Sequence, residues 1–137
     1  MHGARGQLRD LYPLIQVYLA GAITDYEDPR TWRARAKELL LDPLMAVDPQ
    51  EHEVDYSDPK GVVRTDLNLI RGCQALLIDA RAPSWGTAME VYHAWRTGKI
   101  NFGWGAPSGA SPWLRAYVDL YPTLDEAVAA IRKRYDV

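Results

Sequence analysis

The feature that most constrains this chain is an apolar run at residues 75–79, ALLID, which ends in a carboxylate. A short apolar run bounded by turn residues is typical of a strand that is buried on both faces of a parallel sheet. In open α/β sheets, ligands bind where the carboxyl ends of strands meet loops and helix N-termini. Residues 80–90, ARAPSWGTAME, follow the run directly. We therefore expect the functional site in this segment.

Glu90 is the first candidate residue of this site. Gly86 and Thr87 open a predicted helix and place Glu90 in its first turn, near unpaired N–H groups and the positive end of the helix dipole. Gly86 also allows a ligand or a backbone segment to approach closely. We expect a glutamate there to stay ionised and to suit nucleophilic attack on a sugar carbon. The alternative is a local role in which Glu90 only complements the helix dipole.

Length and composition indicate one globular domain. The chain has 137 residues, of which 47% are apolar and 25% charged, which is enough for a core of its own. We treat residues 1–137 as one domain with a polar tail at residues 1–12. A net charge of −2 without a basic stripe argues against a nucleic acid polymer as partner. The lack of a long apolar run and of a signal-peptide pattern predicts a cytoplasmic protein without a membrane partner.

Strand and helix patterns alternate along the chain, which predicts the α/β class with a parallel, doubly wound sheet. The predicted strands are residues 14–20, 45–47, 75–79, 100–104 and 117–121. The first predicted helix spans residues 29–41 with Asp28 as its N-cap, and the second begins at residue 62 with a core face at Val63, Leu67 and Ile70. The third spans residues 86–97, and the last follows a capping box at residues 123–126. Cys73 is expected to be a reduced thiol in the core.

Asp66 is the second informative acid, because it lies on or beside the apolar stripe of the helix after residue 62. A half-buried carboxylate is costly unless it is paired or functional. The alternative is a rim acid that pairs with Arg64 or Arg71. The aperiodic stretch 50–61 contains His52 among acids, but its spacing is not that of metal ligands, so no metal is predicted.

Two acids near one strand suit glycosidic chemistry, in which one carboxylate attacks the anomeric carbon while another group manages protons. Tyr18, near the end of the first predicted strand, is a third candidate. The sequence has no phosphate-binding GxxxxGK[ST] or GxGxxG motif and no GxSxG nucleophile elbow.

Three sequence blocks resemble the nucleoside 2-deoxyribosyltransferase family. They are VYLAGAI at residues 17–23, TDLNLI at residues 65–70 and SWGTAMEVYHAWRTGK at residues 84–99, in the family's order. The resemblance implies a flavodoxin-like three-layer fold with a five-stranded parallel sheet. It also implies a homo-oligomer in which a neighbouring subunit completes each pocket, and no cofactor. In the family's pattern Glu90 is the nucleophile, Asp66 assists with the sugar and the departing base, and Tyr18 orients the nucleophile.

The implied activity is cleavage of an N-glycosidic bond and transfer of 2-deoxyribose between nucleobases through a covalent intermediate on Glu90. Its partners would be a small nucleoside or nucleotide and a free nucleobase. The candidate substrate-binding residues are Gly21, Asp48, Asp79, Ser84, Trp85, Gly86, Thr87 and Ser111. Trp85 and Trp104 could supply aromatic walls for the flat base, with core or subunit packing as the alternative.

Ser84 departs from the well-known bacterial transferases, which carry an acid at this place for the sugar 5′-hydroxyl. A serine there resembles the sister group, the 2′-deoxynucleoside 5′-monophosphate N-hydrolases, where it binds the phosphate, and Ser111 of a neighbouring subunit would add a donor. Arg81 is the one nearby cation in the sequence, whereas the nearby Asp79 disfavours an anion. A plain N-cap role for Ser84 also stays open. The third alternative is a catalytically silent nucleotide-binding module, which need not keep both acids.

Overall fold

The computed structural model describes residues 14–23 and 29–137, so the predicted tail at residues 1–12 and the predicted cap at residue 28 lie outside them. The described chain contains one five-stranded sheet, ordered β2-β1-β3-β4-β5, in which every neighbouring pair is parallel. The strands are β1 (Ile15–Ala20), β2 (Leu44–Val47), β3 (Ala75–Asp79), β4 (Ile100–Trp104) and β5 (Asp119–Tyr121). The predicted α/β class with a five-stranded parallel sheet is confirmed.

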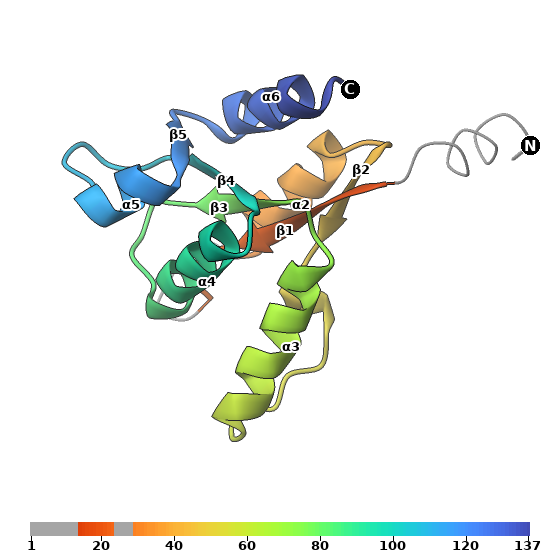
Figure 1. Ribbon diagram of the computed structural model, residues 1–137, viewed down its shortest axis with the longest axis vertical. Coiled ribbons are helices and arrows are strands. Elements are labelled where there is room, and N and C mark those ends of the chain that lie inside the picture. Colours follow the sequence, from red (N-terminus) through yellow and green to blue (C-terminus); the bar gives the residue numbers. More distant parts are fainter. Residues whose placement is uncertain (1–13, 24–28) are drawn as a thin grey trace, which may run out of the picture.

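Helices cover both faces of this sheet (Figure 1). They are α2 (Thr31–Leu39), α3 (Pro59–Arg71), α4 (Trp85–Arg96), α5 (Pro112–Tyr117), α6 (Leu124–Tyr135) and the short 3₁₀ helix η1 (Pro49–Glu51). Helices α2 and α6 pack on one face, and α3, α4 and α5 pack on the other. This is the three-layer, flavodoxin-like arrangement, in which the winding reverses between β1 and β3 and leaves a crevice at their carboxyl ends.

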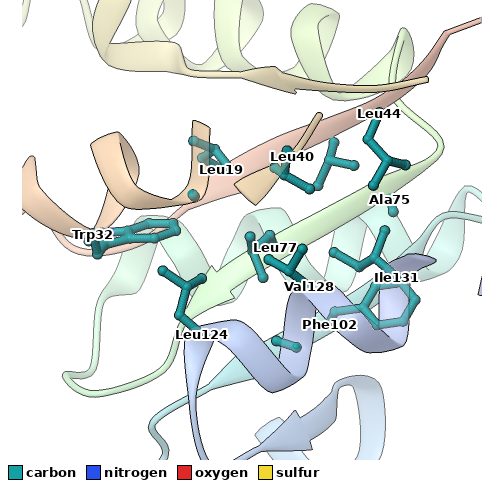
Figure 2. Close-up of a cluster of buried hydrophobic side chains, with 13 residues drawn as sticks. Leu19, Trp32, Leu40, Leu44, Ala75, Leu77, Phe102, Leu124, Val128 and Ile131 are labelled. Carbon is teal, nitrogen blue, oxygen red and sulfur yellow. The ribbon is translucent and has the colours of Figure 1, made fainter. Parts of the chain in front are cut away.

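Successive side chains of β1 point to opposite faces of the sheet and contribute to two separate hydrophobic cores. Val17 and Leu19 point toward α2 and α6, where they join a cluster that includes Trp32 and Ile131 (Figure 2). The intervening Tyr18 points to the opposite face, against residues of α3 and α4. The two-residue period of a strand therefore delivers the Tyr18 phenol to the layer that carries Asp66 and Glu90.

Several predicted boundaries differ from the observed ones. Helix α3 begins at Pro59 rather than at residue 62, because the Asp58 side chain accepts a hydrogen bond from the Gly61 N–H and caps the helix. Val63, predicted to face the core, is 54% exposed, whereas Ile70 is buried. The prediction failed at Val63 because only the C-terminal part of α3 packs on the sheet.

The segment predicted as one strand at residues 117–121 divides into two elements. Residues up to Tyr117 belong to α5, which Ser111 caps, and β5 follows at Asp119–Tyr121. Helix α2 ends at Leu39 rather than at residue 41. The predicted buried thiol of Cys73 is confirmed. Across residues 14–23 and 29–137, no helix combines the length and apolarity that a membrane span requires.

Candidate active site

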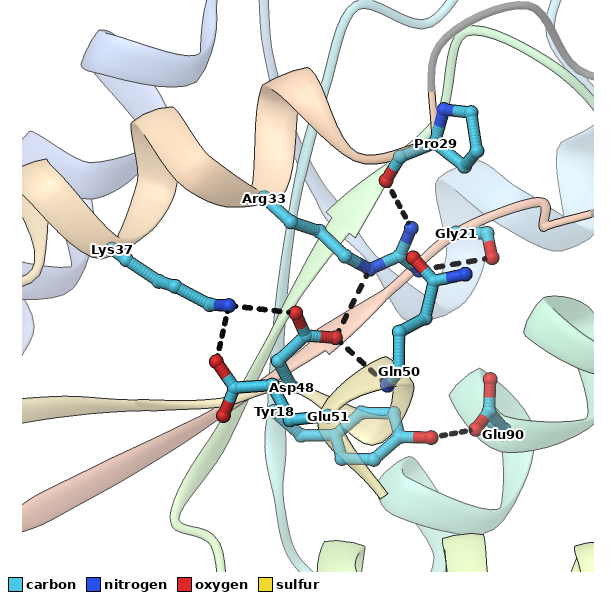
Figure 3. A network of polar contacts seen from close by, with 9 residues as sticks. All are labelled: Tyr18, Gly21, Pro29, Arg33, Lys37, Asp48, Gln50, Glu51 and Glu90. Carbon is cyan, nitrogen blue, oxygen red and sulfur yellow. Dashed lines mark hydrogen bonds and ion pairs between the residues drawn. The ribbon is translucent and has the colours of Figure 1, made fainter. Parts of the chain in front are cut away.

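Tyr18 and Glu90 form the centre of the candidate site at the carboxyl ends of β1 and β3. The Tyr18 hydroxyl donates a hydrogen bond to Oε2 of Glu90 (Figure 3). Tyr18 is almost fully buried, and Glu90 is partly buried. Burial, followed by the negative charge of Glu90, raises the pKa of Tyr18 well above its ordinary value. The phenol therefore stays protonated and acts as a donor that holds the carboxylate in one orientation.

Glu90 differs from its prediction in position and in charge. Helix α4 begins at Trp85, with Ser84 as N-cap, so Glu90 lies in the second turn and not in the first. The pKa of Glu90 is raised to about 7, chiefly by burial and also by the negative charge of Asp66. The hydrogen bond from Tyr18 and the positive charge of Arg33 lower it and offset part of this rise. This upward shift of the pKa runs against the expectation that the helix start keeps Glu90 ionised.

Asp66 of α3 is half-buried on the same side of the sheet. Burial raises its pKa, and the charge of His52 partly offsets this effect. The negative charge of Asp66 in turn raises the pKa values of both Tyr18 and Glu90, so the three groups act on one another electrostatically. A cleft of about 260 Å³ between residues 53–58 and the start of α3 is lined in part by Asp66. In the described part of the chain, Asp66 forms no ion pair with Arg64 or Arg71.

Asp79 is a buried acid that is already neutralised. It follows the apolar part of β3 and is 2% exposed. The Arg81 guanidinium binds it through two hydrogen bonds, Nε to Oδ1 at 3.0 Å and Nη2 to Oδ2 at 2.9 Å. The same guanidinium lies over the Trp104 ring, 4.3 Å from its centroid. Arg81 therefore neutralises Asp79. Trp104 packs against Arg81 and Trp32, which agrees with the alternative that this tryptophan packs within the protein and does not form a wall for the base.

Asp48, at the end of β2, is also neutralised. Lys37 Nζ lies 2.9 Å from Oδ2, and Arg33 Nε lies 3.6 Å from Oδ1 (Figure 3). Oδ1 also accepts a hydrogen bond from the Gln50 N–H at 2.9 Å, which caps η1. Asp48 thus joins α2, β2 and η1, and its oxygens are occupied by protein groups.

The N-terminus of α4 contains four of the predicted substrate-binding residues. Ser84 Oγ accepts a hydrogen bond from the Thr87 N–H at 3.3 Å, which agrees with the N-cap alternative, while its O–H remains a donor. Trp85 is 87% exposed, so it does not belong to the core. A Cβ added at Gly86 would meet no atom of the described residues within 4 Å, so their packing does not require glycine there.

Gly21 and Ser111 have local structural roles. A Cβ at Gly21 would lie 3.1 Å from the Asp79 Cβ and 3.2 Å from the Trp32 ring, so a larger residue there would require these neighbours to shift. Ser111 Oγ accepts from the Trp113 N–H at 3.2 Å and caps α5. Neither residue is hydrogen-bonded to the Tyr18–Glu90 pair among the described contacts.

Two polar residues of the site were missed by sequence reasoning. Arg33 is buried between α2 and the sheet edge. Its position, next to Trp32 and three residues before Ala36, places it on the core side of the helix, and that spacing could have revealed it. The side-chain oxygen of Gln50 is buried and accepts no hydrogen bond from the residues that the structure describes, so it could accept one from a ligand or water. The described residues contain no cluster of three His, Cys, Asp or Glu side chains that could hold a metal ion.

A group of four aromatic rings lies on α4 and α5, of which three are exposed and that of Tyr117 is half-buried. We define this aromatic surface as Tyr92, Trp95, Trp113 and Tyr117. Their ring centroids lie 4.7–6.2 Å apart in successive contacts, and Trp113 is 71% exposed. Large exposed apolar groups of this kind are typical of an interaction surface.

Comparisons with known proteins match this arrangement at the level of the fold. No family model matches the sequence, and no curated protein sequence matches it. A conserved protein from Enterococcus faecalis V583 is similar in structure, with a TM-score of 0.72, 16% identity, and coverage of 88% of this chain and 99% of that chain. A 2-deoxyribosyltransferase from Bacillus psychrosaccharolyticus has a TM-score of 0.69 and 17% identity, covering 82% of this chain and 90% of that one.

A 2-deoxyribosyltransferase from Leishmania mexicana is also similar, with a TM-score of 0.66, 18% identity, and coverage of 90% of this chain and 99% of that chain. At these identities the likeness establishes the three-dimensional arrangement of the elements. The described chain therefore has the fold of the nucleoside 2-deoxyribosyltransferases.

Proposed function

We propose that this protein cleaves the N-glycosidic bond of 2′-deoxynucleosides and transfers the 2-deoxyribose to a second nucleobase. The observation that carries the proposal is the hydrogen bond that Tyr18 of β1 donates to Glu90 of α4. This carboxylate is oriented by a neutral donor and has no ion pair among the described residues. An oriented, unneutralised carboxylate is the group that nucleophilic attack on a sugar carbon requires.

In the proposed reaction, one oxygen of ionised Glu90 forms a bond to C1′ of the sugar. The bond between C1′ and the base nitrogen breaks, and its electron pair leaves with the base, which takes up a proton. A nitrogen of the second base then attacks C1′ and gives up its proton to the Asp66 carboxylate, while the bond between C1′ and the Glu90 oxygen breaks and the Glu90 carboxylate is released. Because Glu90 has a pKa of about 7, turnover rises with pH through the neutral range.

Asp66 and Tyr18 have supporting roles in this proposal. Asp66 is half-buried on the same side of the sheet and burial raises its pKa, so we assign to it the transfer of a proton to the departing base. The Tyr18 hydroxyl keeps Glu90 in the orientation for attack. The chain's own residues supply every group that these steps use, so the proposal includes no cofactor.

The aromatic surface supports a homo-oligomer in which a second copy covers α4 and α5. Trp85 and Met89 extend the exposed apolar area along α4 toward the N-terminus of the helix. A partner on this side would come close to Ser84 and Gly86 and would help to enclose the pocket. The open space around Gly86 leaves room for such an approach by a partner or by the substrate.

Hydrolysis of 2′-deoxynucleoside 5′-monophosphates is the second candidate. One observation favours it over the sequence expectation: the charge of Asp79, which would repel a phosphate, is neutralised by Arg81. Ser84 retains a hydroxyl donor at the N-terminus of α4, where an anion is stabilised.

The test is to incubate the protein with 2′-deoxynucleosides or with their 5′-monophosphates, each with and without a second free base, and to follow products by chromatography. A new nucleoside that forms only with the acceptor base is expected from the transferase. If free base is released from the monophosphates whether or not an acceptor base is present, the protein is a hydrolase of 2′-deoxynucleoside 5′-monophosphates and not a transferase. Glu90→Ala should stay folded and release negligible base; undiminished turnover in this variant would contradict the assignment of the nucleophile.

A further inference from the structure

Helix α3 has an apolar face that the described residues cover at one end only. Val63, Leu67 and Ile70 are spaced so that they lie on one face of the helix. Ile70 is buried, Leu67 is half-buried and Val63 is 54% exposed. Figure 1 shows that the N-terminal half of α3 extends away from the sheet. The exposed part of this face therefore needs another surface to pack on.

The same half of α3, with the loop before it, forms a groove and carries negative charge. We define residues 51–64 as the projecting arm. A groove of about 380 Å³ on the projecting arm is lined by Pro59, Lys60, Val63 and Arg64. The exposed acids of the projecting arm are Glu51, Glu53, Asp55 and Asp58. They outnumber its two cations, Lys60 and Arg64, and Tyr56 adds an aromatic ring that is 63% exposed. The projecting arm is therefore partly apolar and negative.

The aromatic surface on α4 and α5 has the opposite charge. Trp85 and Met89 extend its apolar area and are 87% and 68% exposed. Arg96 and Arg115 are exposed on the same two helices, and neither forms an ion pair with a residue that the structure describes. Glu90, the one acid in the sequence of these helices, is partly buried in the candidate site. The aromatic surface is therefore apolar and positive.

We propose that two copies of this chain form a two-fold dimer in which the projecting arm of each copy lies on the aromatic surface of the other. Helices α3, α4 and α5 cover the same face of the sheet, so one two-fold axis can bring both pairs of surfaces together. Opposite charges then face each other, and the exposed apolar groups of the two surfaces cover each other. The dimer rests on the proposed function only in that a second copy covers α4 and α5, and not on any enzymatic activity.

This contact has a consequence for the candidate site. The cleft of about 260 Å³ that Asp66 lines is formed largely by residues of the projecting arm. A second copy on the projecting arm fixes this wall and reduces the access of water to Asp66. In the proposed function Asp66 exchanges a proton with the base, so the dimer is the more active form.

The experiment measures association of the full-length protein by sedimentation equilibrium without substrate. The surface variant carries Arg96→Glu and Arg115→Glu, and the arm variant carries Glu53→Lys and Asp55→Lys. In each variant alone, like charges face each other at both contacts of the two-fold dimer. The dissociation constant of the dimer should therefore rise about 10-fold or more. An equimolar mixture of the two variants should form dimers again, because opposite charges then meet at both contacts.

Glu126→Lys and Lys133→Glu are the matched controls, because they reverse exposed charges on α6, on the opposite face of the sheet. Both should leave the association unchanged. Val63→Glu, at the groove, replaces the arm variant if that variant does not fold. A wild type that sediments as a monomer, an arm variant that associates like the wild type, or a mixture that stays monomeric would overturn the proposal. An arm variant that dimerises while the surface variant does not would show that two aromatic surfaces pack on each other instead.

Turnover separates the failure of this proposal from the failure of the proposed function. If the wild type dimerises as expected but releases no base, the proposed function fails and the dimer stands. If the wild type releases base as a monomer, the dimer fails and the proposed function stands. If both proposals hold, base release should fall in each variant alone and recover in their mixture, in parallel with the sedimentation result.

Discussion

Glu90→Gln should destroy base release and at the same time stabilise the fold. The folded protein raises the pKa of Glu90 from its ordinary value of 4.5 to about 7, chiefly through burial. The folded state therefore binds this proton more tightly than the unfolded chain does. Stability falls as pH rises from about 4.5 to about 7, and the penalty is fully present above about pH 8.

The size of the effect follows from the same pKa values. A rise from 4.5 to about 7 corresponds to about 3.5 kcal/mol, at roughly 1.4 kcal/mol for each pKa unit. Glu90 is only partly buried, so solvent screening reduces the expected penalty to about 1–2 kcal/mol. Glutamine has nearly the same shape, can still accept the Tyr18 hydrogen bond and never ionises, so the variant avoids this penalty.

The assay is urea unfolding of wild type and Glu90→Gln at several pH values between 5 and 9. The variant should gain stability over the wild type as pH rises, with the difference reaching a plateau near pH 8. Glu126→Gln, at an exposed position in α6, is the control for the chemical change alone. A difference that does not depend on pH, or a variant that is less stable at pH 8, would refute the reasoning.

Three further predictions test the surroundings of this pair. Tyr18→Phe should lower turnover by about 10- to 100-fold and move the acid limb to higher pH, because the hydrogen bond that lowers the Glu90 pKa is lost; an unchanged pH profile would argue against that bond. Arg81→Met should destabilise the fold by about 3 kcal/mol in urea, because it leaves buried Asp79 unpaired; a neutral effect would show that the pair contributes little. Trp95→Glu should dissociate the proposed oligomer in sedimentation experiments, whereas Lys133→Glu on the exposed side of α6 should not; a persistent oligomer would place the interface elsewhere.

The order of strands and helices could be predicted because each strand is a short apolar run and the segments between elements contain residues typical of turns. Residues 75–79 were predicted as a buried strand and form β3. The segment after residue 105 could not be predicted as well. Helix α5 has only six residues and no buried member, so no apolar period distinguishes it from a loop.

The candidate site was predictable in its residue types and not in its charge states. The positions of Tyr18 and Glu90 follow from one strand period and one helix start, and the structure brings them into contact. The pKa of Glu90 depends on how much water the folded chain excludes and on charges from α2 and α3, which no local pattern contains. The local spacing around Arg33 indicates that it is buried, but two of its partners are 12 and 15 residues away in the sequence, so these contacts could not be predicted.

The four acids near the carboxyl edge of the sheet fall into two groups, those that pair with an arginine and those that the proposed function uses in the reaction. Asp48 and Asp79 are the more deeply buried acids, and each is bound by an arginine. Asp66 and Glu90 form no ion pair within the described residues, although burial raises the pKa of both. A fold that neutralises two of its acids with buried or stacked arginines has the means to neutralise the others. The two that it leaves uncompensated reduce its stability, and such a cost is typical of residues that are kept for chemistry.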